Sequence, residues 1–315
     1  MVMRPPLLVI VGPTGVGKTA VAVRLGGRLA LEIVSADSRQ VYQGMDVGTG
    51  KPTPAERAAV KHHLLDLICP DERYHAARFC REALEVIGDI RAREKLPAVV
   101  GGTGLYVRAL LKGLDAAPPA DPELRSSFEA VARQEGNLAL HGRLAAVDPS
   151  AAAHLHPNDR IRIIRALEKH AARCPVGAQD GGGWGRSRPP WRVLAIGLSR
   201  ERRILNQSLK ERVEGMVARG MMDEVRGLLA AGYDDGSPGM NGIGYRQFVA
   251  VARGRLDEAE ATRLMVRDTQ RYAKRQMTWF QRDAEIHWLD VDRAGGIEGT
   301  AEAIGKLITR EGWTE

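Results

Sequence analysis

The chain has 315 residues and a formal net charge of +7, and its hydrophobic content of 44% and charged content of 27% are ordinary for a globular protein. This composition excludes a disordered or collagen-like chain, and the longest apolar runs, such as residues 7–11, are far shorter than the roughly 20 residues of a membrane span. The three cysteines, Cys69, Cys80 and Cys174, form no CxxC pair, which excludes a disulfide scaffold and a zinc module and favours the reducing cytoplasm.

The N-terminal third predicts a parallel sheet covered by helices. The apolar run at residues 7–11, a glycine-rich turn and an alternating apolar segment at 19–30 indicate a strand, a loop and a helix. A second strand at 32–36 ends at Asp37, and a helix at 76–95 leads to a third strand at 97–100 that ends in two glycines. Ligands of such sheets bind at the carboxyl ends of the strands, where all three motifs lie.

The middle of the chain predicts a helical insertion. Residues 115–122 form a proline-rich hinge, 123–173 have helical spacing, and 174–190 are too glycine-rich for regular structure. A strand at 191–197 and helices from Ser199 onward return the chain to the first domain. The predicted fold is therefore α/β: a P-loop NTPase-like parallel sheet core from residues 1–114 and 191–315, flanked by helices, with an all-helical domain from 115–190 inserted.

The segment GPTGVGKT at residues 12–19 fits the phosphate-loop pattern G-x-x-x-x-G-K-[ST] between a predicted strand and helix. Backbone N–H groups of such a loop surround phosphate oxygens at the positive end of the helix. The Lys18 ammonium adds charge and the Thr19 hydroxyl can hold Mg²⁺, which makes Thr19 the predicted metal ligand. The predicted diphosphate-binding residues are Gly12, Pro13, Thr14, Gly15, Val16, Gly17, Lys18 and Thr19.

Two further strand ends carry candidate catalytic side chains. Asp37, beside the phosphate loop, could bind magnesium through water or act as a general base. Thr103 follows two glycines at the end of another strand. Each has a simpler alternative, since Asp37 could be a turn or helix-capping residue and a hydroxyl beside glycines often only caps a helix.

The phosphate loop, SADSRQVYQGMDVGTGKPT at 35–53 and GGTGLYVRALLKGL at 101–114 together resemble the bacterial tRNA dimethylallyltransferases, an isopentenyl-transferase family that modifies the adenosine next to the anticodon. Several co-linear motifs at family spacing are more specific than a lone phosphate loop. The resemblance covers nearly the whole chain and continues at residues 62–66, 121–125, 157–159, 162–168, 220–225, 242–246 and 274–280.

The resemblance implies a donor, an acceptor and a cofactor. N6 of adenosine-37, in tRNAs that read codons beginning with U, attacks the dimethylallyl group of dimethylallyl diphosphate, and pyrophosphate leaves with Mg²⁺ as cofactor. N6 is a poor nucleophile, so the enzyme must accept its proton, neutralise the diphosphate and align both substrates. By family position Asp37 is the general base and Thr103 lies at the acceptor and leaving group. Arg212 is our choice for a further catalytic cation, with a surface arginine as the alternative.

The implied partner is the tRNA anticodon stem-loop, from which the acceptor must flip out. Arginines at 263, 267, 271 and 275 would line one helix face with only Asp268 to offset them, either as a solvated face or as phosphate contacts. The tRNA-binding residues predicted from this stripe and the family segments are Asp37, Ser38, Arg39, Gln40, Thr103, Arg125, Arg162, Arg165, Asn241, Gly242, Ile243, Gly244, Tyr245, Arg246, Arg271, Lys274, Arg275, Gln276, Met277, Thr278, Trp279, Phe280 and Gln281.

The chain departs from the family at a few positions, since Ile161 replaces a usual Gln at a tRNA contact and Gly50 a frequent Ala. The chain ends without the Cys/His zinc finger of eukaryotic relatives, which favours a bacterial-type enzyme, and we expect a cytoplasmic monomer with no membrane partner. Two other classes stay open: a P-loop kinase of small molecules, which would consume ATP, and a non-catalytic RNA-binding ATPase. A kinase does not explain the helical insertion or the arginine stripe, and an RNA-binding ATPase gives the GGTGLY motif no function.

Overall fold

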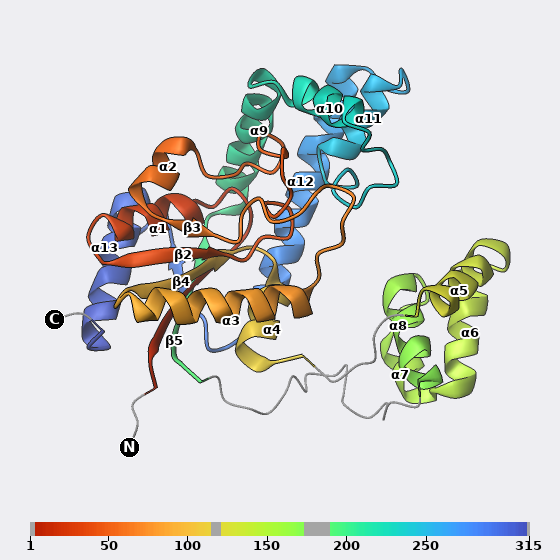
Figure 1. Ribbon diagram of the computed structural model, residues 1–315, viewed down its shortest axis with the longest axis horizontal. Helices are drawn as coiled ribbons and strands as arrows, with labels where there is room; N and C mark the ends of the chain where they lie inside the picture. The colour runs from red at the N-terminus through yellow and green to blue at the C-terminus, as the bar shows by residue number, and fades with distance from the viewer. Residues whose placement is uncertain (1–3, 115–120, 173–189, 314–315) are drawn as a thin grey trace. The chain divides into compact units, whose positions relative to one another are not determined.

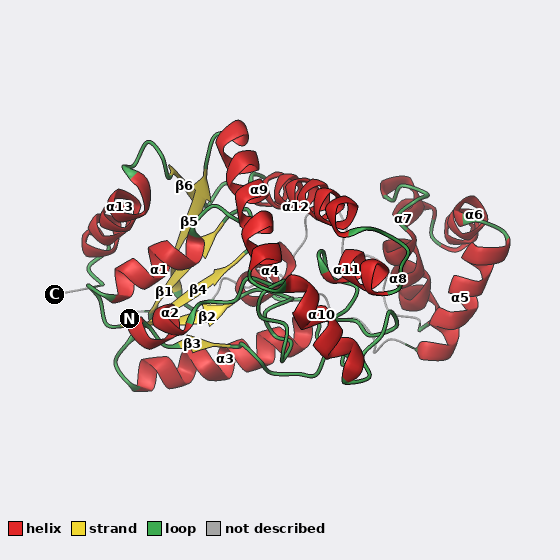
Figure 2. Ribbon diagram, turned by 90° about the horizontal axis from the view of Figure 1, so that it is seen from above, coloured by secondary structure: helices red, strands yellow, loops and turns green. Residues whose placement is uncertain are grey.

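The computed structural model describes residues 4–114, 121–172 and 190–313, and the chain divides into two compact units. The core unit combines residues 1–111 with 189–315, and the helical unit comprises residues 112–188. The core unit contains a parallel sheet with helices on both faces, as the sequence predicts (Figures 1 and 2). No helix in these described ranges is both long and apolar enough to cross a membrane.

The sheet has six strands, and every neighbouring pair is parallel. The central strands are buried on both faces, which explains their continuous apolar sequences, PLLVIV and LPAVVG. The two edge strands are not predicted from the sequence, because strands of only two and four residues carry little periodic signal. In spatial order the strands are β3 (His62–His63), β2 (Leu31–Ser35), β4 (Leu96–Gly101), β1 (Pro6–Val11), β5 (Arg192–Ser199) and β6 (His287–Asp290).

Helices cover both faces of this sheet, with α1 above it and α3 below it in Figure 1. Helix α1 packs against α13, and α9 packs against α12. The predicted helix at 19–30 is shorter in the structure, because it ends at the glycine pair 26–27. The helices of the core are α1 (Lys18–Gly26), α2 (Pro54–Ala59), α3 (Ala76–Ala92), α4 (Gly104–Lys112), α9 (Arg202–Ala218), α10 (Met221–Ala230), α11 (Tyr245–Ala252), α12 (Glu258–Phe280) and α13 (Gly296–Arg310).

A second hydrophobic cluster lies outside the sheet. It joins side chains of the loop after β2, such as Val41 and Met45, to α10, α11 and α12 through Met221, Phe248 and Met265. All five of these side chains are at most 2% exposed. The loop that follows Asp37 is therefore held by core packing rather than left free at the surface.

The described part of the helical unit consists of helices around a small core of its own, including Leu140, Leu144 and Ile163. Asp121 caps the first helix, and its side chain accepts hydrogen bonds from two backbone N–H groups of the first turn. The hinge at 115–120 and the glycine-rich segment at 174–189 lie outside the described residues. The helices are α5 (Pro122–Gln134), α6 (Asn137–Val147), α7 (Pro149–His154) and α8 (Arg160–Ala171).

Candidate active site

The carboxyl ends of β1, β2 and β4 meet at one edge of the sheet. Val11 is in register with Gly101, and Ser35 with Val100, so the residues that follow these three strands are neighbours. Gly101 lies so close to the Ala36 carbonyl that a Cβ on it would overlap that oxygen. The phosphate loop, Asp37 and Thr103 are thereby brought to the same edge of the sheet.

The phosphate loop connects β1 directly to α1 and depends on its glycines. Gly12 has φ +144°, and a Cβ there would lie 2.5 Å from the Leu198 carbonyl oxygen. Gly17, with φ +104°, precedes the first residue of α1. Side chains at both positions would be strained, whereas glycine adopts these conformations freely. The loop therefore places the N-terminus of α1 at the edge of the sheet where the three strands end.

Lys18 lies within this loop, and its Nζ donates hydrogen bonds to the carbonyl oxygens of Gly12 (3.0 Å) and Pro13 (2.8 Å). Burial lowers the pKa of Lys18 to about 8. The Asp37 carboxylate opposes this shift, and the Arg212 guanidinium adds to it. The lysine is still largely protonated at pH 7 and supplies a poorly solvated cation at the loop.

Asp37 combines a turn role with a place in the cavity. Its Oδ1 accepts hydrogen bonds from the backbone N–H groups of Arg39 (2.8 Å) and Gln40 (3.4 Å), which is the turn that the sequence left open as an alternative. The same side chain lines the cavity beside Lys18 and exerts an electrostatic effect on it. The two roles are compatible because a carboxylate has four lone-pair positions.

Thr103 forms hydrogen bonds with the two residues that flank Asp37 in the chain. Its Oγ1 accepts a hydrogen bond from the Ser38 N–H at 3.0 Å, and its own N–H donates to the Ala36 carbonyl at 3.2 Å. Burial and the nearby Asp37 charge raise the pKa of the Tyr272 hydroxyl to about 12. Thr103 is not among the described residues that line the cavity. Instead, it supports the Asp37 segment through its hydrogen bond with Ser38.

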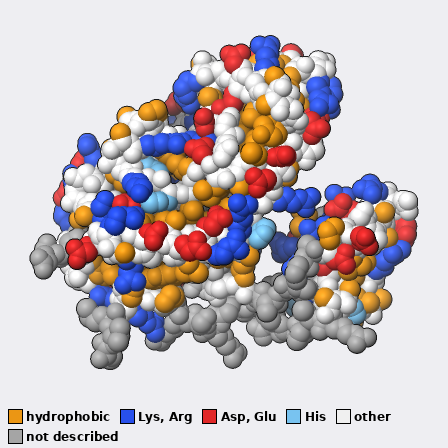
Figure 3. Space-filling view, in the orientation of Figure 1, with side chains coloured by type: hydrophobic (Ala, Val, Ile, Leu, Met, Phe, Trp, Pro, Cys, Tyr) orange, Lys and Arg blue, Asp and Glu red, His pale blue; other side chains and the backbone are white. Residues whose placement is uncertain are grey.

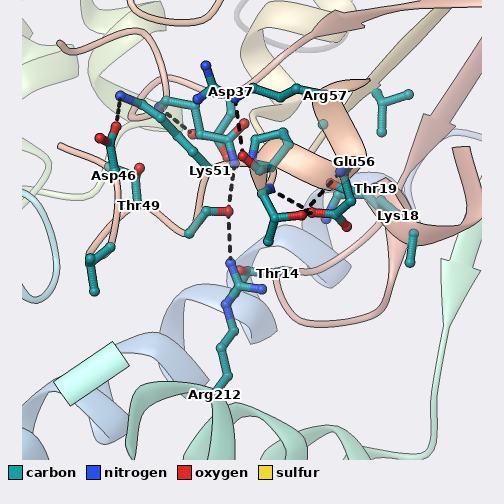
Figure 4. A pocket seen from close by; sticks show the side chains of 18 of the residues that line it. Thr14, Lys18, Thr19, Asp37, Asp46, Thr49, Lys51, Glu56, Arg57 and Arg212 are labelled. Carbon is teal, nitrogen blue, oxygen red and sulfur yellow. Dashed lines mark hydrogen bonds and ion pairs between the residues drawn. The ribbon is translucent and has the colours of Figure 1, made fainter. Parts of the chain in front are cut away.

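Arg212 reaches the cavity from α9 (Figure 4). Its Nη2 donates to the carbonyl oxygen of Gly50 at 3.4 Å. Burial lowers the pKa of Arg212, and the charge of Asp37 counteracts that shift. The structure therefore brings Lys18, Asp37 and Arg212, from three separate parts of the chain, to one cavity.

The cavity has a volume of about 990 Å³, and part of its wall was not predicted as site residues. Lys51 is 8% exposed, and its Nζ donates to the Tyr42 carbonyl and to Asp46 Oδ1, both at 2.6 Å, and also to Asp66. The sequence signal that could have identified Lys51 as a site residue is its position in GTGKPT, within the segment at 35–53 that resembles the family. The other cavity residues absent from the sequence prediction include Glu56, Arg57, Asp66 and Arg219.

Glu224 is a further residue that sequence reasoning missed. Its Oε2 accepts from the N–H groups of Asp46 and Val47 at 2.7 Å, and its Oε1 accepts from that of Gly48 at 3.0 Å and from the Tyr245 hydroxyl at 2.6 Å. Three consecutive backbone N–H groups thus hold one carboxylate. This fastens α10 to the cavity wall.

The predicted tRNA segment 241–246 divides between surface and core. Asn241 and Arg246 are exposed, and Arg246 Nη2 forms an ion pair with Asp268 at 2.6 Å. Gly242, Gly244 and Tyr245 are buried, and Ile243 is half-buried. Half of this segment is therefore buried inside the protein, where the Tyr245 hydroxyl donates a hydrogen bond to Glu224.

The arginine stripe on α12 is more balanced by acids than its sequence suggests. Arg263 forms an ion pair with Glu260 at 2.5 Å. Asp268 forms ion pairs with both Arg267, at 3.0 Å, and Arg246. Burial would raise the pKa of Asp268, but hydrogen bonds from Arg246 and Arg267 outweigh it and lower that pKa. On the face of the core unit seen in Figure 3, basic and acidic side chains are likewise interspersed.

The C-terminal half of α12 also has two faces. Exposed side chains lie on one face, and buried ones point into the core. Gln276 and Phe280 are only 6% and 3% exposed, and Met277 is half-buried. The exposed members of the predicted tRNA set on this helix and at its end are Arg271, Lys274, Arg275, Thr278, Trp279 and Gln281.

The remaining predicted tRNA residues make contacts within the protein. Gln40 Nε2 donates to the Gly50 carbonyl at 3.2 Å, and Arg39 Nη1 donates to the Pro238 carbonyl at 3.0 Å. In the helical unit the buried Glu168 carboxylate binds Arg125 at 2.8 Å and Arg165 at 2.9 Å. Arg162 pairs with Asp159 at 2.9 Å and stays 66% exposed, and its neighbour Ile161 is 81% exposed.

Comparison with known proteins finds similar sequences along most of the chain. The family described as IPP transferase matches residues 40–283, and that described as isopentenyl transferase matches residues 5–67. The chain is 47% identical to tRNA dimethylallyltransferase 1 of Syntrophotalea carbinolica, over 91% of each chain, and 45% identical to the tRNA dimethylallyltransferase of Thermomicrobium roseum, over 98% of this chain and 93% of the other.

The fold is likewise similar to a solved structure. The crystal structure of the tRNA isopentenylpyrophosphate transferase of Bacillus halodurans is 37% identical to this chain, covers 98% of both chains and has a TM-score of 0.70. The sequence matches span both the phosphate loop and the residues that form the cavity. The chain therefore belongs to the IPP transferase family.

Proposed function

We propose that this protein is a magnesium-dependent tRNA dimethylallyltransferase. It transfers the dimethylallyl group of dimethylallyl diphosphate to N6 of adenosine-37 in tRNAs that read codons beginning with U. One observation carries the proposal: a carboxylate, Asp37, shares a cavity with the two cations Lys18 and Arg212 at the mouth of a phosphate loop. A proton acceptor beside a diphosphate site is what prenyl transfer to an amine requires.

The phosphate loop binds the diphosphate of the donor. The N-terminus of α1 faces the negative oxygens, and Lys18 and Arg212 neutralise charge as pyrophosphate leaves. The described residues hold no group of three His, Cys, Asp or Glu side chains suited to a metal, so Mg²⁺ would take most ligands from diphosphate and water, with Thr19 as the protein ligand. Magnesium supplies further charge neutralisation at the diphosphate.

The acceptor adenine is activated by Asp37. The N6 lone pair forms a bond to C1 of the prenyl group while the C1–O bond breaks, and its electron pair leaves with the diphosphate. The proton lost from N6 passes to the Asp37 carboxylate. Since Oδ1 already accepts hydrogen bonds from two backbone N–H groups, the side chain is held in a fixed orientation for this transfer.

The anticodon stem-loop binds to exposed basic side chains. On α12 these are Arg271, Lys274 and Arg275, which contact phosphates and contribute affinity with little sequence preference. Among the predicted tRNA residues of the helical unit, Arg162 is the exposed cation. The enzyme acts as a cytoplasmic monomer in this proposal.

A transfer assay tests the proposal directly. Purified protein, Mg²⁺, radiolabelled dimethylallyl diphosphate and unmodified bulk tRNA are mixed, and the labelled nucleoside is identified after digestion. We expect label on N6 of the adenosine that follows the anticodon, and none when Mg²⁺ is chelated. A folded protein that labels no tRNA would overturn the proposal, and ATP turnover by that protein would favour a kinase instead.

A further inference from the structure

Gln276 forms a bridge inside the core unit that the proposed function does not use. The side chain projects from α12, is 6% exposed, and has both polar atoms engaged. Its Oε1 accepts a hydrogen bond from the Thr14 N–H at 2.8 Å, and its Nε2 donates to the Gly102 carbonyl at 2.8 Å. The orientation of the amide follows from its partners, because a backbone N–H can only donate and a carbonyl can only accept.

The two hydrogen-bond partners of Gln276 lie in two different loops, each of which follows a strand of the sheet. Thr14 is in the middle of the phosphate loop, which holds the donor in the proposed reaction. Gly102 precedes Thr103, which accepts from the Ser38 N–H next to Asp37. One buried amide therefore connects the backbone of the donor loop to the backbone that supports the general base.

The fit around this amide is tight on the Gly102 side. A Cβ on Gly102 would overlap the Nε2 atom of Gln276, so glycine at 102 leaves space for the bridge. A shorter side chain at 276 could not reach both backbone groups at once. Because the carbonyl and the N–H belong to two different loops, the glutamine side chain ties those loops together at a separation that matches its length.

We propose that Gln276 is a positioning residue that sets the spacing between the phosphate loop and the acceptor-side loop at residues 101–104. This inference rests on the proposed function. Bond formation between C1 and N6 requires the reacting atoms to be held about 3–3.5 Å apart, and a misplacement of 1 Å can lower the rate about a hundredfold. With the spacing relaxed, each substrate still binds to its own loop, but the two no longer meet in line. The loss falls on kcat rather than on either KM.

The test compares two substitutions of glutamine by methionine on the same helix. Gln276→Met keeps the length of the side chain and removes both hydrogen bonds. Gln270→Met is the matched control, because Gln270 is also on α12 but donates to the Asn206 carbonyl of α9 at 3.2 Å rather than to either loop. We expect Gln276→Met to lower kcat at least about thirtyfold, with the KM for dimethylallyl diphosphate and for tRNA each within about threefold of wild type. Gln270→Met should leave all three constants unchanged.

A second variant covers the case in which Gln276→Met does not fold. Gln276→Asn retains a polar amide but is one methylene shorter, so it loses at least one of the two contacts, and we expect the same separation of kcat from KM. Binding of inorganic diphosphate by folded variants, measured by calorimetry, should stay within about threefold of wild type because the phosphate loop itself is intact.

The outcomes separate this inference from the proposed function. If the wild-type protein labels no tRNA, the proposed function fails first. If it does label tRNA, then an unchanged kcat in both Gln276 variants overturns the positioning role. So does a loss confined to KM, or an equal loss of kcat in Gln270→Met.

Discussion

Arg212 Nη2 donates a hydrogen bond to the carbonyl oxygen of Gly50, and a Cβ on Gly50 would overlap that guanidinium. Gly50 has φ +58°, a conformation that glycine adopts more easily than other residues. The same carbonyl accepts from Gln40 Nε2, so one backbone oxygen holds two side chains of the site. The Gly50 carbonyl therefore holds the Arg212 guanidinium at the cavity wall.

We predict that Arg212→Met lowers kcat about a hundredfold, since no guanidinium would then face the leaving diphosphate and removing one well-placed charge donor costs about 10²–10³. Steady-state transfer kinetics check this. Lys210→Met, which removes an exposed cation of the same helix that pairs with Glu214, is the control and should leave kcat unchanged. Wild-type turnover in Arg212→Met would show that the Arg212 cation is not needed.

Asp37→Asn should retain tRNA binding and lose most turnover. Asparagine keeps a side-chain oxygen for the backbone N–H groups of Arg39 and Gln40, so the turn survives, but it cannot accept the N6 proton. We expect kcat to fall about 10²–10⁴-fold and the tRNA dissociation constant to change less than about threefold. A variant with near-normal turnover would remove Asp37 as the base.

Glu224→Ala should destabilise the core unit. The change leaves the N–H groups of residues 46–48 and the Tyr245 hydroxyl without their carboxylate. We expect the free energy of unfolding to fall by about 2–3 kcal/mol, measured by urea denaturation. Asp223→Ala, one position earlier and 82% exposed, should change it by less than about 0.5 kcal/mol. Equal effects of the two would argue against the role of Glu224.

Arg271→Ala and Arg275→Ala should each weaken tRNA binding and reduce the slope of log affinity against log salt by about 1, because each removes one phosphate contact. Binding measured between about 50 and 200 mM salt tests this. Lys306→Ala on α13 removes an exposed cation that pairs with Glu302 and should leave the slope unchanged. A wild-type slope in both arginine variants would mean that this face of α12 contacts solvent and not the tRNA phosphates.

Glu32 should make the protein sensitive to acid. Its carboxylate is 2% exposed; burial would raise its pKa, but Arg93, His63 and Lys95 outweigh burial and lower the pKa to about 2 from the usual 4.5. A depressed pKa stabilises the folded state above pH 4.5, and this stabilisation is lost as the pH falls from 4.5 towards 2.

The expected contribution of Glu32 to the free energy of unfolding is about 3 kcal/mol. Denaturant unfolding of wild type and Glu32→Gln between these pH values would measure it. The difference in unfolding free energy between the two proteins should shrink steadily as the pH falls. A constant difference would show that the carboxylate is not what the cations stabilise.

The local parts of the site were predictable from the sequence. GPTGVGKT specifies a loop between a strand and a helix through glycine conformations and a helix N-terminus, and the apolar runs at 7–11 and 97–100 specify buried parallel strands. The positions of Asp37 and Thr103 at strand ends followed from the same pattern. These features depend on interactions between neighbours in the chain, which a single sequence displays directly.

Tertiary structure alone decided which residues of the recognised segments face the solvent and which hold the site together. Gln276, Phe280 and Tyr245 lie within segments predicted to bind tRNA, yet each is buried, and Glu224 gains its role from backbone groups about 180 residues away, at 46–48. Side chains of this kind act through partners that are distant in the chain. Their direction is set by packing between α10, α11 and α12, and neither residue type nor spacing encodes that packing locally.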